Sequence, residues 1–143
     1  MYTGLLHLHS TLRYVVLVLL VVTLAKVLIT HFAKRNYTET DRKFGLYTLI
    51  SVHLQLVVGL ILYFVSPMIS GGLDDMGEAM KNPALRFYVV EHFVTMLLGI
   101  TMITIGYSRI KRSTDNSKKA LKTLIFYGIG FLLILIRMPW DRW

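Results

Sequence analysis

The sequence predicts an all-α integral membrane protein, a single bundle of four helices that each cross the bilayer. The chain has 143 residues, of which 55% are hydrophobic and only 17% are charged, a composition that is atypical of a soluble domain. The apolar residues also form four long stretches between short basic loops, and none of these stretches alternates with the period of a strand. An isolated span can satisfy its backbone groups in lipid only as a helix, and about 20 residues suffice to cross the hydrocarbon.

The four helices are predicted at residues 4–33, 44–66, 83–109 and 119–138. The first stretch lacks a basic region before it and a small-residue cleavage site after it, so we expect a retained helix rather than a signal peptide. Ser66-Pro67 is predicted to close the second helix and Gly71-Gly72 to form a turn. Asn82-Pro83 combines a capping residue with a proline at the first helical position, which is typical of a helix start. Met138-Pro139 is predicted to end the fourth helix, and with no repeat or linker present, residues 1–143 form one domain.

The cationic residues predict the orientation of the chain in the membrane. The loops after the first and third helices together hold ten of the sixteen lysines and arginines, namely Lys34, Arg35, Arg42, Lys43, Arg109, Lys111, Arg112, Lys118, Lys119 and Lys122. The positive-inside rule predicts that these loops lie in the cytoplasm and that both termini lie on the outer (periplasmic) side of a cytoplasmic-type membrane. The net charge of +8 is explained by topology and contact with the lipid bilayer, so no nucleic-acid partner is expected.

Three histidines lie in three different predicted helices of a chain that contains no cysteine. Imidazoles facing the interior of a bundle are typical ligands of a b-type haem, whose iron takes two of them at a similar depth. His92 lies five residues after Phe87, about 7 Å below the outer boundary, and His9 begins near the same level. His53 lies thirteen residues before Ser66, about 20 Å below that boundary. We therefore predict His9 and His92 as the axial pair, and His53 as a deeper residue that influences the cofactor.

Three arginines, Arg13, Arg86 and Arg137, are predicted near the outer boundary, where the positive-inside rule does not favour cations. Haem propionates, a quinone head group or anionic lipid would each give them a partner, because the arginine fork binds carboxylates well. Arg13 follows His9 by four residues and so shares its helical face.

Simpler interpretations of these polar residues stay open. Each histidine can serve as a hydrogen-bonding residue between helices. Glu91 can pair with Arg86 or Arg13 at the membrane edge, and Lys26 can extend toward the inner interface or pair with an internal carboxylate. A proton pathway through Glu91, His92 and His53 is less favoured, because four short helices leave little room for alternating access.

Several short motifs resemble a family of small four-helix bacterial membrane proteins described as cytochrome b-like, or b561-like. The motifs span most of the chain: Leu8-His9-Ser10 with Arg13-Tyr14, His53-Leu54-Gln55 before Gly59-Leu60-Ile61-Leu62-Tyr63, Glu91-His92 with Met96, and Met138-Pro139-Trp140. The resemblance implies haem binding by the bundle histidines His9, His53 and His92 and a role in membrane electron transfer, with quinone as a candidate redox partner. It does not identify the axial pair. Three histidines are too few for two haems with two histidines each, so one haem is expected.

These observations predict a haem-binding electron-transfer protein without a substrate-specific catalytic group. The alternative is a non-catalytic accessory subunit of a larger respiratory or translocation complex, in which the histidines and arginines only pack or bind lipid. Other membrane subunits or further copies of the chain are the expected protein partners.

Overall fold

The computed structural model describes residues 1–140, and it contains helices and no strands in that part of the chain. Four helical stretches are long and apolar enough to cross a membrane: α1 (Tyr2–Phe32), α2 (Glu39–Val65), the continuous stretch Pro83–Arg112, and α7 (Asn116–Ile136). The third stretch consists of α5 (Pro83–Arg86), a π-helix η1 (Phe87–Glu91) and α6 (His92–Arg112). Two short helices, α3 (Pro67–Asp74) and α4 (Met76–Lys81), precede it. The predicted fold class is thereby confirmed.

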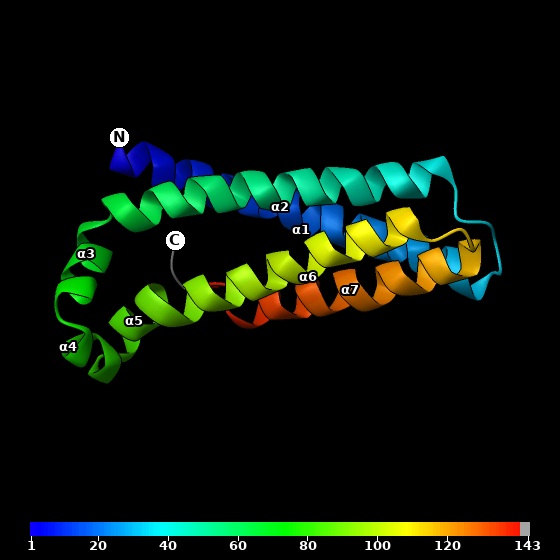
Figure 1. Ribbon diagram of the computed structural model, residues 1–143. Coiled ribbons are helices and arrows are strands. Elements are labelled where there is room, and N and C mark those ends of the chain that lie inside the picture. The colour runs from blue at the N-terminus through cyan, green and yellow to red at the C-terminus, as the bar shows by residue number, and fades with distance from the viewer. Residues whose placement is uncertain (141–143) are drawn as a thin grey trace.

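The bundle consists of two antiparallel helical hairpins, α1–α2 and α6–α7, which meet mainly where α1 packs against α7. Helices α2 and α6 touch less than these pairs do. The start of α1 and the end of α7 lie at the same end of the bundle as α3, α4 and α5 (Figure 1). The connections at residues 33–38 and 113–115 lie at the opposite end, which is called the basic end below because the lysines and arginines of both loops gather around them.

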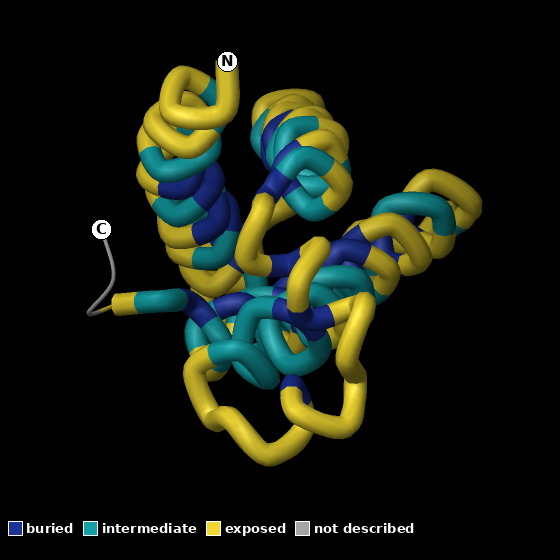
Figure 2. Tube along the Cα trace, turned by 90° about the vertical axis from the view of Figure 1, so that its left-hand side faces the viewer, coloured by how far each residue is buried: buried dark blue, intermediate teal, exposed yellow. Residues whose placement is uncertain are grey.

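Buried residues line the surfaces where the helices face one another, whereas the outward surfaces are exposed (Figure 2). Large apolar side chains dominate these outward surfaces, and Phe64 is 74% exposed. Such a distribution fits contact with lipid.

Inside the bundle, the hydroxyl groups of Thr23 and Thr48 lie 2.8 Å apart and join α1 to α2. Helices α6 and α7 cross at Gly99 and Gly130, where a Cβ atom on Gly130 would lie 2.8 Å from the Gly99 carbonyl oxygen, so small residues are needed there.

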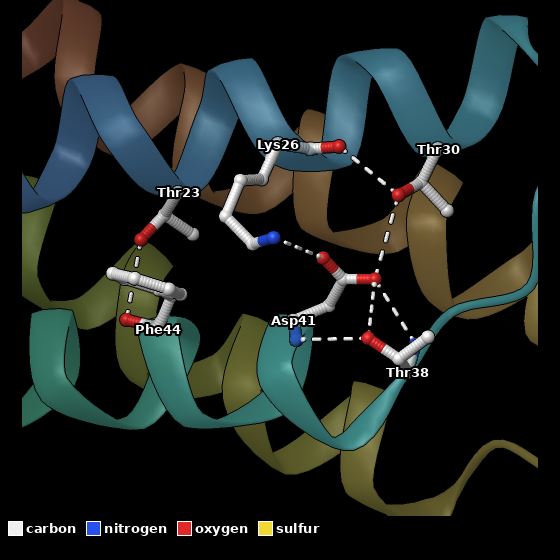
Figure 3. A network of polar contacts seen from close by, with 6 residues as sticks. All are labelled: Thr23, Lys26, Thr30, Thr38, Asp41 and Phe44. Carbon is white, nitrogen blue, oxygen red and sulfur yellow. Dashed lines mark hydrogen bonds and ion pairs between the residues drawn. The ribbon is translucent and has the colours of Figure 1, made fainter.

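The start of the second helix differs from the prediction, because α2 begins at Glu39 rather than at residue 44. Thr38 caps the helix, and its backbone N–H donates to the Asp41 carboxylate at 3.0 Å, in a capping box that makes the earlier start favourable (Figure 3). Asp41 is only 3% exposed; it also accepts from the Thr30 hydroxyl at 3.4 Å and lies 3.7 Å from the Lys26 ammonium. Lys26 thus has the internal carboxylate partner that the sequence left open, and the contact joins α1 to α2.

The connection before the third span also differs from the prediction. Gly71 and Gly72 lie inside α3 rather than in a turn, and the chain bends instead at Asp75. A Cβ atom on Gly72 would lie 2.6 Å from a methyl group of Val89, so glycine serves close packing against η1 here. Three helix ends differ from the prediction by a few residues: α1 ends at Phe32, α6 at Arg112 and α7 at Ile136. The end of α7 precedes the proline at position 139, and a proline disfavours helical backbone in the residue before it.

Candidate functional site: a cavity between His9 and His92

A cavity of about 460 Å³ lies between the two hairpins at the end that carries α3–α5. Its walls come from α1, α2, α3, η1, α6 and the end of α7, and most of the side chains in them are apolar. The polar lining groups include His9, Ser10, Arg13, Gln55 and His92. A largely apolar cavity of this size with a few convergent polar groups is typical of a small-molecule or cofactor site.

His9 and His92 face each other in this cavity. Their ring centres lie 6.4 Å apart, and the ring planes are inclined by 80°. His92 Nδ1 lies 2.8 Å from the carbonyl oxygen of Arg137, and because that oxygen can only accept, Nδ1 carries the proton. The neutral His92 ring then has its lone pair on Nε2, the nitrogen that is available to a ligand. Phe87 stacks on the same ring at 5.9 Å and helps to hold its orientation.

Helix α2 fixes the position of His9. The Gln55 amide donates to the carbonyl oxygen of His9 at 2.9 Å, and a Cβ atom on Gly59 would lie 3.1 Å from Cε1 of the His9 ring. Any larger side chain at position 59 would push against the imidazole. His9 Nδ1 is buried and has no hydrogen-bond partner within the described residues, and the same holds for Oε1 of Gln55. Buried polar atoms of this kind usually have a partner, so these two atoms are consistent with a cavity that holds a ligand or water.

The π-helix η1 leads directly into His92. Its wider turn changes the pattern of backbone hydrogen bonds, and the Tyr63 hydroxyl of α2 donates to the carbonyl oxygen of Val89 within it at 2.8 Å. Tyr63 also stacks on Phe93 at 4.4 Å, so α2 contacts the entry of α6 twice. Single π-turns inside α-helices occur frequently at functional sites. This π-turn was not predictable from the local sequence, because Phe87–Glu91 has an ordinary apolar helical composition.

The structure separates the three predicted arginines into two groups. Arg13 is only 7% exposed and lines the cavity, with its guanidinium carbon 5.0 Å from the centre of the Tyr14 ring. Arg86 and Arg137 contact Glu91 instead, at 3.0 and 3.8 Å, and neither is among the described residues that line the cavity. Glu91 therefore has the Arg86 partner that the sequence suggested, together with Arg137 rather than Arg13.

His53 lies away from the cavity. Its side chain is exposed on the surface between α2 and α6, where Nε2 and the Thr104 hydroxyl lie 3.0 Å apart. The structure thus brings His9 and His92 together. His53, which was predicted deeper inside the bundle with an influence on the cofactor, instead has an exposed side chain. Gln55 and Gly59 are site residues that the sequence offered only as parts of the family motifs, without a role in the site. Their spacing of four residues, which puts both on one face of α2, was the available signal.

The donor set limits what the cavity can bind. In residues 1–140 no group of three or more histidine, cysteine, aspartate or glutamate side chains could hold a metal ion. Two imidazoles alone are a sparse site for a bare zinc ion, because structural and catalytic zinc sites take at least three protein ligands. A metal held here would need its other ligands from an organic group, as the iron of a porphyrin has.

Comparisons with models of protein families, with curated proteins and with solved structures find nothing similar to this chain. The likeness to cytochrome b-like proteins therefore depends on the short motifs alone.

Proposed function

We propose that the protein binds one b-type haem in the cavity, with His9 and His92 as axial ligands, and acts as an electron carrier in a bacterial inner membrane. The observation that carries this proposal is the 6.4 Å separation of the two ring centres. A metal–imidazole bond of about 2.0 Å plus roughly 1.1 Å from nitrogen to ring centre, taken twice, gives about 6 Å for two imidazoles on one metal. The rings therefore stand at the distance that a shared metal needs.

The residues around the His9 and His92 rings also suit a haem. The bond from His92 Nδ1 to the Arg137 carbonyl leaves Nε2 for a metal and orients the ring, as backbone carbonyls do for many ligating histidines. Arg13 brings a buried positive charge to the cavity wall, where it can pair with the carboxylate of a haem propionate. The apolar lining suits a porphyrin ring, and a haem would contact the cavity next to the buried polar atoms of His9 and Gln55 that have no partner in the described residues.

When bound, a haem supplies one-electron chemistry between ferric and ferrous iron. The chain's own residues would set its properties. His9 and His92 would hold the iron in a low-spin state, and the positive charge of Arg13 would favour the reduced form of the haem. A quinone in the same membrane is the redox partner that we propose, because the apolar side chains of Leu6 and Met68 line the cavity and are also exposed on the outside of the bundle.

The test is a reduced-minus-oxidised absorption spectrum of the purified protein, produced with a haem supply. His9→Ala and His92→Ala should each abolish the low-spin haem spectrum, because each removes one proposed ligand. His53→Ala is the matched control: it removes a spanning histidine outside the cavity and should keep the pigment. Loss of haem in His53→Ala, with haem retained in His9→Ala, would contradict the assignment.

One observation favours a second function, that of an accessory subunit in a larger membrane complex or a homo-oligomer. His53 and Thr104 form a polar pair on an exposed surface within the predicted spans, and polar groups facing lipid are costly. Contact with another membrane subunit would cover them. A parent protein that stays colourless when haem is supplied would support this function over electron transfer.

A further inference from the structure

A second cavity, of about 260 Å³, lies at the basic end of the bundle, far from the histidine pair. It is formed by the connection between α1 and α2 together with the adjacent ends of α2, α6 and α7. Three cations line it, Arg42 of α2, Lys111 of α6 and Lys119 of α7. Three separate helices therefore each bring one positive charge to one small cavity.

The cavity keeps an excess of positive charge after its internal contacts are considered. Arg42 forms an ion pair with Glu39, the only acidic residue in the described lining. Arg42 Nη1 also lies 3.4 Å from the hydroxyl oxygen of Tyr107, which leaves the Tyr107 O–H hydrogen available to a ligand. Lys119 lies over the ring of Tyr37, 5.9 Å from its centre. One carboxylate cannot neutralise three cations, so the cavity attracts an anion.

We propose that this cavity binds the phosphate of an anionic phospholipid headgroup. Basic pockets between transmembrane helices on the cytoplasmic side bind such headgroups, and this cavity lies where the apolar spans end. Beyond the cavity, α2 and α6 carry exposed apolar side chains, including Ile50 of α2 and Ile105 of α6. These side chains give the acyl chains of a lipid a surface to lie on. A soluble phosphate shares the headgroup chemistry but not the contact with that surface.

The experiment measures retained lipid by native mass spectrometry of protein in neutral detergent, incubated with phosphatidylglycerol or phosphatidylcholine. The parent should retain phosphatidylglycerol in preference. If each cation that contacts the headgroup contributes about fivefold in affinity, the triple variant Arg42→Gln, Lys111→Gln, Lys119→Gln should lose about a hundredfold. The matched control Lys34→Gln, Arg35→Gln, Lys118→Gln removes the same charge from the same end but outside the cavity, and should lose less than about twofold.

Two further measurements keep the result interpretable. Lys111 is exposed, so Lys111→Glu should leave the helical circular dichroism unchanged while lowering phosphatidylglycerol retention by about fivefold or more. Inorganic phosphate at millimolar concentration is then tested for protection of lipid-free protein against thermal unfolding. Equal lipid losses in both triple variants, or no preference of the parent for phosphatidylglycerol, would overturn the proposal. Protection by phosphate that depends on the cavity, without lipid preference, would identify a soluble anion and overturn it as well.

Discussion

Replacing Asp41 by alanine should destabilise the α1–α2 hairpin more than replacement by asparagine. The Asp41 carboxylate accepts the Thr38 backbone N–H at 3.0 Å and the Thr30 hydroxyl at 3.4 Å, and lies 3.7 Å from the Lys26 ammonium (Figure 3). Alanine removes all of these contacts. Asparagine keeps a side-chain oxygen for the Thr38 N–H and loses chiefly the ion pair.

The contacts set the expected magnitudes. Loss of the reciprocal cap at the start of α2 costs about 1 kcal/mol. Lys26 is 37% exposed, so its ion pair is partly screened and contributes up to about 1 kcal/mol. Asp41→Ala should therefore lower the free energy of unfolding by about 2 kcal/mol, and Asp41→Asn by about 1 kcal/mol.

Unfolding in mixed micelles with a rising fraction of dodecyl sulfate, followed by far-ultraviolet circular dichroism, measures these differences. Lys26→Gln should match Asp41→Asn, and the double variant should be no less stable than either single variant, because the same ion pair is lost in each. If the losses of unfolding free energy in Lys26→Gln and Asp41→Asn simply add in the double variant, the ion pair between the two residues is refuted. An Asp41→Asn protein that is as unstable as Asp41→Ala would refute the separate role of the cap.

Three more predictions concern topology and the haem cavity. Cysteine labelling in intact cells should leave Lys34→Cys protected and label Asp74→Cys, since the basic end is proposed to face the cytoplasm; the reverse pattern would invert the bundle. Gly59→Leu should lower haem content at least about tenfold, because a side chain there meets the His9 ring, whereas Gly59→Ala should lower it less. Arg13→Gln should keep the low-spin spectrum and lower the midpoint potential, and an unchanged titration would remove Arg13 from the cofactor site.

The pairing of His9 with His92 illustrates how far sequence reasoning reached in the site. Helical rise and the ends of the apolar stretches were enough to place the two histidines at one level and His53 at another. The Arg86–Glu91 pair was among the contacts that the sequence suggested, but the contact of Arg137 with Glu91 was not. Whether Arg137 extends to Glu91 or into the cavity depends on how α7 ends beside η1, and no pattern along the chain encodes that geometry.

The sequence by itself determined that the chain is a bundle of membrane-spanning helices, because the length and apolarity of a span follow from the thickness of the hydrocarbon and the cost of bare backbone groups. The start of α2 at Glu39 was missed, because the prediction placed it at residue 44, although the capping box of Thr38 and Asp41 is a local contact that could have indicated it. Only the tertiary structure decided where the helices separate to leave a cavity, that Gly59 makes room for His9, and that Arg42, Lys111 and Lys119 meet at the basic end. These features arise from packing between segments far apart in the chain, which depends on the relative rotation and crossing of whole helices rather than on the composition of any one of them.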